Sequence, residues 1–124
     1  MRTGVLLVDD SVVVRRAIRK SFESAGVLVC GEAENGAQAL EQAQILKPDL
    51  VVMDLAMPIM NGLQAAPRLR QLLPAVPIIL FTLHSTALAQ QASACGITEI
   101  ISKGEPLTRL VSCVKSLLLK ARTA

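Results

Sequence analysis

Aromatic residues are almost absent from this chain: Trp and Tyr do not occur, Phe occurs twice and His once. This scarcity disfavours a surface that stacks nucleic-acid bases on aromatic rings. The core has to be aliphatic, which agrees with an apolar fraction of 52%. A chain of 124 residues can bury one such core and is too short for a second. We therefore expect one domain over residues 1–124.

Metal-binding cysteine spacings and long apolar runs are also missing. Cys30, Cys95 and Cys113 lie far apart, and no Cys-x-x-Cys or Cys/His ligand spacing occurs. They are typical of reduced, mostly buried thiols. No apolar run has the length of a membrane span, and Asp9 and Asp10 fall where a signal peptide would be apolar. These absences predict a cytoplasmic protein without membrane contact.

Positive charge is concentrated near the N-terminus. The net charge is +3, and Arg15, Arg16, Arg19 and Lys20 lie close together at helical spacing. The simpler interpretation is a solvated helix face, and the alternative is a patch that contacts phosphate.

Short aliphatic runs alternate with helical patterns along the whole chain. The runs predict strands over Gly4–Val8, Val27–Cys30, Leu50–Met53, Pro77–Phe81 and Ile97–Ile101. Apolar spacing, cap residues and terminal glycines predict helices over residues 12–25, 36–46, 62–73, 86–95 and 106–122. Pro67 falls inside the third helix, where proline costs about 3 kcal/mol, so a kink or a late helix start is expected.

Strands that are apolar on both faces and alternate with helices indicate a parallel sheet covered on both sides. Right-handed crossovers leave few possible topologies. We expect an α/β protein of flavodoxin-like (βα)5 architecture, a doubly wound five-stranded parallel sheet with strand order 2-1-3-4-5. In such a sheet ligands bind beyond the carboxyl ends of the strands.

Polar side chains follow four of the predicted strands. Asp9 and Asp10 follow the first, Asp54 the third, Thr82 the fourth and Lys103 the fifth. Each has an ordinary explanation by itself, such as a helix N-terminal acid, a turn former or a surface lysine. Their joint placement at one edge of the sheet predicts a functional site.

Three neighbouring carboxylates repel one another unless a cation neutralises them. Oxygen ligands without His or Cys favour Mg²⁺, which binds one or two protein carboxylates, waters and phosphate oxygens. We expect Asp10, Asp54 and the backbone carbonyl of Ala56 to contact the ion. Asp9 is expected to act through a bound water.

Carboxylates with Mg²⁺ suggest phosphoryl chemistry, and an aspartate can itself accept the phosphoryl group. Asp54 is the expected acceptor, because it stands alone at its strand end. Lys103 would pair with the phosphoryl oxygens and Thr82 would hydrogen-bond the attached group. His84, the only histidine, is expected to be neither a phosphodonor nor a metal ligand.

Four motifs at these strand ends match one family. They are VDDS at Val8–Ser11, DLAMPIMNG at Asp54–Gly62, FTLH at Phe81–His84 and ISKG at Ile101–Gly104. With them the chain resembles the receiver domains of bacterial two-component response regulators, such as the chemotaxis protein CheY. The FTLH stretch and the lack of proline after Lys103 are similar to receivers of NarL/LuxR-type transcription regulators.

The resemblance implies that a sensor histidine kinase or phosphotransfer protein, docking near the first helix, phosphorylates Asp54. Mg²⁺ would be held by Asp9, Asp10 and Asp54, and Thr82 and Lys103 would read the phosphoryl group. The last two predicted helices and the strand between them would then shift to engage a partner, or a second copy in a homodimer.

NarL/LuxR-type regulators normally continue into a DNA-binding helix-turn-helix domain, whereas this chain stops at Ala124. We expect no output domain here, so DNA contact would need a domain outside this chain. A stand-alone receiver and a fragment of a longer regulator are both open.

Three positions differ from the usual receiver pattern. Ile100 replaces an aromatic switch residue, so aromatic switching is not available. Leu83 replaces a small residue and is bulky enough to restrict access to the phosphoryl group. Gly104 stands where many receivers have a proline that a cis peptide bond joins to the lysine. A cis bond before a residue other than proline costs about 3 kcal/mol. The altered positions concern the relay away from the acids, not the acids themselves.

Two other functions remain as alternatives. A small Mg²⁺-dependent aspartyl phosphatase would usually carry a second Asp two residues after the nucleophile, where this chain has Ala56. A pseudo-receiver scaffold would bind partners without phosphorylation. Ile100 leaves room for it, whereas the intact set argues against it: Asp9, Asp10, Asp54, Thr82 and Lys103. We expect no enzyme beyond a domain that assists its own phosphorylation and dephosphorylation.

Overall fold

A computed structural model describes residues 4–83 and 89–123 of the chain. The described residues contain a parallel sheet of five strands in the order β2-β1-β3-β4-β5. The strands are β1 (Val5–Val8), β2 (Val29–Ala33), β3 (Leu50–Met53), β4 (Ile78–Thr82) and β5 (Glu99–Ser102). The predicted flavodoxin-like topology is confirmed.

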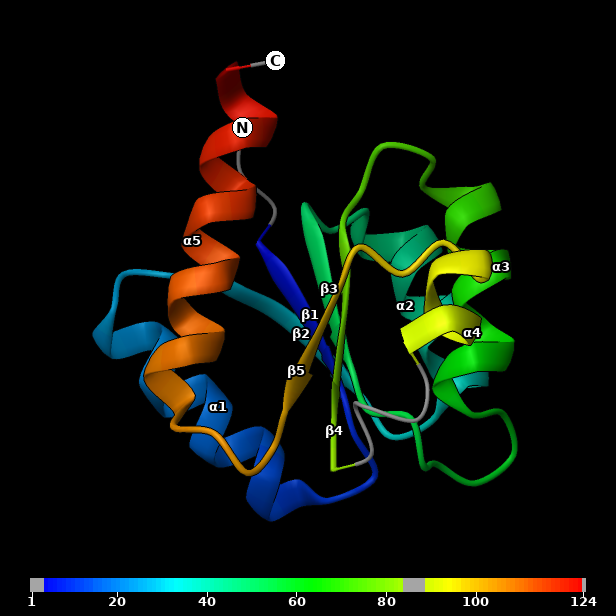
Figure 1. Ribbon diagram of the computed structural model, residues 1–124, viewed down its shortest axis with the longest axis horizontal. Helices are drawn as coiled ribbons and strands as arrows, with labels where there is room; N and C mark the ends of the chain where they lie inside the picture. Colours follow the sequence, from blue (N-terminus) through cyan, green and yellow to red (C-terminus); the bar gives the residue numbers. More distant parts are fainter. Residues whose placement is uncertain (1–3, 84–88, 124) are drawn as a thin grey trace.

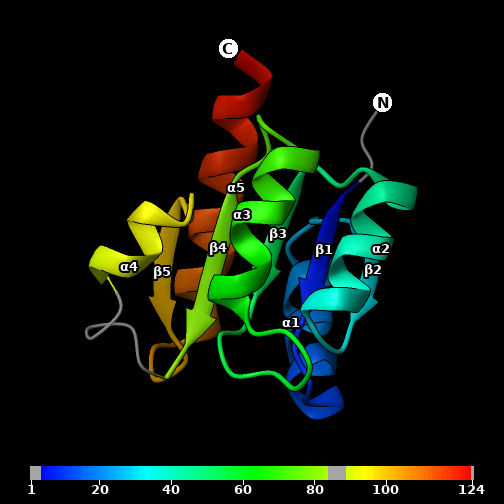
Figure 2. The ribbon, with the colours of Figure 1, turned by 90° about the vertical axis from the view of Figure 1, so that its right-hand side faces the viewer.

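Helices cover both faces of this sheet. They are α1 (Val12–Ser24), α2 (Gly36–Leu46), α3 (Gly62–Leu72), α4 (Ala89–Ala94) and α5 (Leu107–Thr123). Figures 1 and 2 show α1 and α5 on one face and α2, α3 and α4 on the other. All strands run in the same direction, so their carboxyl ends meet at one edge of the sheet (Figure 1).

The period-two alternation of strand side chains divides the core between the two faces. On β1, Val5 and Leu7 pack in the cluster that includes Phe22 of α1. Leu6 and Val8 point to the other cluster, with the small side chains of α2 and α3. Because β1 is buried on both faces, the segment that follows it starts from a rigid, central position.

Strand β2 begins later and extends further than the apolar run Val27–Cys30 predicted. Val27 belongs instead to the turn after α1, where its N–H donates to the Phe22 carbonyl over 2.8 Å. The strand continues through Gly31 and Glu32, which hydropathy alone does not mark as strand residues. They are tolerated because β2 lies at the edge of the sheet, where one side is open to solvent. Strand β5 similarly starts two residues later than expected, at Glu99.

Of the two alternatives expected at Pro67, a kink or a late helix start, the late start is wrong, because α3 starts at Gly62. Asn61 and Gln64 form a capping box, each side chain accepting from the backbone N–H of the other residue. Pro67 lies inside the helix on its exposed side. The buried residues Ala65 and Leu69 hold the helix on the sheet despite the hydrogen bond that proline removes.

Helix α4 is described from Ala89 to Ala94, and the expected start at Thr86 lies outside the described residues. The three cysteines are free and half-buried, so they are less buried than expected. Among the helices described, none is both long enough and apolar enough to cross a bilayer.

Candidate functional site

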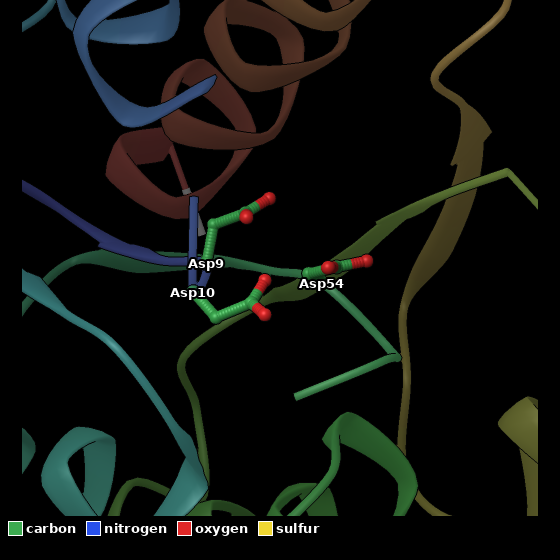
Figure 3. Close-up of side chains that lie close together, drawn as sticks. All are labelled: Asp9, Asp10 and Asp54. Carbon is green, nitrogen blue, oxygen red and sulfur yellow. The ribbon is translucent and has the colours of Figure 1, made fainter. Parts of the chain in front are cut away.

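The carboxyl ends of β1 and β3 bring three carboxylates together. Asp54 N–H donates to the carbonyl of Val8 over 2.8 Å, which continues the pairing of β1 with β3. Oxygens of Asp9, Asp10 and Asp54 then lie within 4.8 Å of one another. Figure 3 shows the three side chains gathered beyond the two strand ends. Asp9 and Asp54 are buried, whereas Asp10 is exposed.

The loop after β3 fixes the acid at its start. Leu55 N–H donates to Asp54 Oδ1 over 2.8 Å. The end of the loop lies beside its start, because Gly62 N–H donates to the Leu55 carbonyl over 2.9 Å. A Cβ at Gly62 would lie 2.5 Å from the Asp54 carbonyl oxygen, so only glycine allows this approach. Asn-Gly at the end of the loop is therefore part of what positions Asp54.

Lys103 reaches the acids from the other side of the site. Its Nζ donates to Asp9 Oδ2 over 2.8 Å and lies 3.3 Å from Asp54 Oδ2. Its backbone N–H donates to the carbonyl of Thr82 over 2.9 Å, which extends the pairing of β4 with β5. The ammonium also lies 5.9 Å from the centre of the Phe81 ring. One ammonium is thus shared by two buried carboxylates.

The charges of this site shift each other's ionisation. Burial raises the pKa of the Asp54 carboxyl, and the Asp9 carboxylate raises it further, although Lys103 offsets part of the change. Burial by itself would lower the pKa of Lys103, but its bonds to Asp9 and Asp54 outweigh this and raise it. In the protein alone, the ionised form of Asp54 is therefore disfavoured. A further cation at the site would stabilise it.

The structure brings together the predicted residues Asp9, Asp10, Asp54, Thr82 and Lys103 at one edge of the sheet. Thr82 ends β4 and is 1% exposed. Two further predictions are less defined. Ala56 is exposed in the loop after β3, and His84 lies outside the described residues. The Lys103–Gly104 bond is trans, as are all peptide bonds in the described ranges.

Sequence reasoning missed the role of one arginine. Arg15 was expected on a solvated helix face or in a phosphate-contacting patch, but it is 8% exposed and its Nη1 donates to the backbone carbonyl of Asp9. Its Nε donates to Glu32 on β2 over 2.8 Å. The signal was available, because Arg15 stands at helical spacing with the buried Ile18 and Phe22.

The donor set suits a hard divalent cation. The clustered ligand atoms are all carboxylate oxygens, which Mg²⁺ prefers. Three carboxylates face one ammonium, so the site keeps an excess of negative charge. Asp10 is exposed, so this side of the cluster is open to solvent.

Comparison with known proteins agrees with this geometry. Residues 5–115 match the family model of the response regulator receiver domain. The chain is 35% identical over 115 residues to the chemotaxis protein CheY of Thermotoga maritima, covering 92% of this chain and 96% of that protein. It is 40% identical over 121 residues to a protein-glutamate methylesterase/protein-glutamine glutaminase of Methanococcoides burtonii, covering 94% of this chain and 34% of that protein.

A solved two-component response regulator of the LuxR family from Aurantimonas superposes with a TM-score of 0.87 at 32% identity. The superposition covers 94% of this chain and 84% of that chain. This likeness partly supports the expected closeness to NarL/LuxR-type receivers, while the chemotaxis relatives match at similar identity.

Several relatives are much longer than the matched region. The chain spans 34%, 56% and 27% of the length of the first three curated relatives. The family model matches residues 5–115, which span the five strands and the acidic edge of this chain. This chain belongs to the response regulator receiver domain family of two-component signalling proteins.

Proposed function

We propose that residues 1–124 act as a phosphorylatable receiver in which Asp54 accepts a phosphoryl group from a sensor histidine kinase or a phosphotransfer protein. The observation that carries the proposal is the bridge from Lys103 Nζ to Asp9 and Asp54, at 2.8 and 3.3 Å. It supports the proposal because two buried carboxylates lie beside a positive charge that could pair with phosphoryl oxygens.

In the reaction, a carboxylate oxygen of Asp54 attacks the phosphorus of a phosphohistidine. The P–N bond breaks, and the leaving nitrogen keeps the electron pair and takes up a proton. The ammonium of Lys103 moves from the carboxylate of Asp54 to the phosphoryl oxygens, because the attached group carries more negative charge. Thr82, at the end of β4, donates a hydrogen bond to that group.

Asp9, Asp10, Asp54 and the backbone carbonyl of Ala56 would hold Mg²⁺, which when bound neutralises charge on the transferring phosphoryl group. The chain's own part is to keep Asp54 ionised, despite a pKa raised by burial, and to orient it against Asp9. Receiver domains are signalling domains rather than enzymes, and any turnover here is the gain and loss of this one group.

The proposed output is a shift of the face formed by α4, β5 and α5. This face would engage a partner protein, a second copy of the chain, or an output domain outside these 124 residues. Contact with DNA would come only through such a domain. The proposed site of action is the cytoplasm, where kinases of this class present their phosphohistidine.

The test uses a small phosphodonor. The protein is incubated with acetyl phosphate and Mg²⁺, and its intact mass is measured. We expect one phosphoryl adduct, which requires Mg²⁺ and is lost in Asp54→Ala. Asp49→Asn is the matched control, because Asp49 lies at the opposite end of the same strand and bonds Gly4 N–H there; it should keep the adduct.

Absence of an adduct in the wild type with every donor would contradict the proposal and favour a scaffold without phosphorylation. Rapid hydrolysis of unrelated phosphate esters would instead favour an aspartyl phosphatase. An adduct that persists in Asp54→Ala would place the acceptor elsewhere.

A further inference from the structure

Arg15 connects three elements that surround the acidic site. It lies on α1 and is buried, at 8% exposure. Its Nη1 donates to the backbone carbonyl of Asp9, just after β1, and its Nε donates to Glu32 Oε1 on β2. A guanidinium can serve both acceptors at once, because its donors form a rigid planar fork.

Glu32 is held from two sides. Arg15 bonds its Oε1 and Arg19 bonds its Oε2, each over 2.8 Å. Burial by itself would raise the pKa of Glu32, but the two arginines lower it below its ordinary value. Glu32 is therefore ionised at neutral pH and keeps Arg15 in one orientation.

Two further hydrogen bonds, besides the one from Lys103, hold Asp9 in place. Asp9 N–H donates to the Ala33 carbonyl over 3.0 Å, and Asp9 Oδ1 accepts from Ser11 N–H over 2.9 Å. With Arg15 on its carbonyl, the backbone of Asp9 is fixed on both sides of its Cα. Asp10 follows directly, so its exposed carboxylate depends on the same backbone.

We propose that Arg15, held by Glu32, is a positioning residue that sets the Asp9–Asp10 backbone for cation binding. It does not touch the cation or the phosphoryl group. The inference rests on the proposed Mg²⁺ site. Some groups orient a metal ligand without contacting the metal. Removing such a group typically changes the metal affinity by about 10- to 100-fold.

The direction of the change in Mg²⁺ affinity distinguishes a positioning role of Arg15 from a simple effect of its charge. Arg15→Gln removes a positive charge near a cation site, which by electrostatics alone would strengthen Mg²⁺ binding or leave it unchanged. Loss of positioning would weaken it. Arg15→Lys keeps the charge but not the fork, so only positioning predicts a weaker site in that variant.

The experiment measures the Mg²⁺ dissociation constant by isothermal titration calorimetry, with circular dichroism as the check of folding. We expect the constant to rise about tenfold in Arg15→Gln and to rise in Arg15→Lys as well. Arg19→Gln is the matched control, because Arg19 bonds the same Glu32 but not Asp9; its constant should stay within about twofold of the wild type.

The kinetics of phosphorylation by acetyl phosphate provide a second readout. We expect the Mg²⁺ concentration for half-maximal rate to rise in Arg15→Gln, with little change in the rate at saturating Mg²⁺. A general loss of structure would lower both. If Arg15→Gln does not fold, Arg15→Lys serves in both measurements.

Unchanged or tighter Mg²⁺ binding in the Arg15 variants would overturn the positioning role. A loss in Arg19→Gln as large as in Arg15→Gln would also overturn it, because the effect would then not depend on the Asp9 contact. If the wild type itself binds no Mg²⁺, the proposed function fails instead, so the two failures are distinguishable.

Discussion

The two halves of the acidic edge are supported in different ways. In the first half, Asp9 at the end of β1 is held by Arg15, Ser11 and Ala33, which are groups outside the reacting set. In the second half, beyond β4 and β5, the Lys103 ammonium is held by the site acids Asp9 and Asp54. Outside these acids, the backbone N–H of Lys103 bonds the Thr82 carbonyl, and its ammonium lies 5.9 Å from the centre of the Phe81 ring.

The two kinds of support imply different responses to a change in the charge of the site. We expect Asp9 and Asp54 to keep their places when the charge of the site changes, because Arg15, Ser11 and Leu55 hold them. The Lys103 ammonium contacts Asp9, Asp54 and the face of the Phe81 ring, so we expect it to follow the charge on Asp54. We therefore expect a phosphoryl group or a cation at the acids to move the Lys103 ammonium before it moves the backbone of β1.

The largest expected effect concerns Lys103. In Lys103→Met without Mg²⁺, the buried Asp9 and Asp54 lose their shared cation, which we expect to lower the free energy of unfolding by about 3 kcal/mol. Urea unfolding at neutral pH measures it. Lys115→Met, at an exposed position of α5, should change it by less than about 0.5 kcal/mol. Equal unfolding midpoints for the wild type and Lys103→Met would refute the shared-cation assignment.

The pH range of this contribution follows from the direction of the shift. The folded protein raises the pKa of Lys103 above its ordinary value of 10.5, because Asp9 and Asp54 outweigh its burial. The stabilisation is therefore complete below that value and is lost as the pH rises through the folded pKa. The difference between Lys103→Met and the wild type should shrink only in strongly alkaline solution.

The next effect has the opposite sign. Burial and the Asp9 carboxylate raise the pKa of Asp54 above its ordinary 3.8, so the ionised form destabilises the Mg²⁺-free fold. We expect Asp54→Asn to raise the free energy of unfolding at pH 7, on the order of 1 kcal/mol. The advantage should disappear as the pH falls through the folded pKa, because the wild type then gains stability by protonation. An advantage that is constant with pH would argue against charge as its cause.

The smallest effect concerns Leu83, at the rim of the second half. Its side chain is 69% exposed directly after the buried Thr82. If it limits water access, Leu83→Ala should shorten the lifetime of the aspartyl phosphate about threefold, as a barrier lower by about 0.6 kcal/mol would do. Loss of the phosphoryl adduct with time measures this. Leu119→Ala, at a leucine 63% exposed on α5, is the control and should keep the wild-type lifetime.

The sequence was informative about the site because strand ends are easy to find. Aliphatic runs such as Leu50–Met53 end where a charge begins, and the parallel topology then brings Asp9, Asp10 and Asp54 together. The edge strand β2 was harder, because a strand exposed on one side tolerates residues such as Glu32 that carry no hydropathy signal.

Arg15 was only partly predictable. Its spacing with Ile18 and Phe22 indicated the buried face of the helix, but the sequence did not show its partner. Its burial depends on Glu32, which is 17 residues away and becomes its partner only when β2 lies beside β1. Pairwise contacts of this kind come from the tertiary fold, and a single sequence does not show them.

The most direct test of the account is the Mg²⁺ affinity of Lys103→Met, measured by calorimetry against the wild type. If Lys103 and the cation compete for the oxygens of Asp9 and Asp54, removing the ammonium should tighten Mg²⁺ binding at least about fivefold, the factor that corresponds to about 1 kcal/mol. Weaker or equal binding in Lys103→Met would contradict the claim that the two cations share these carboxylates.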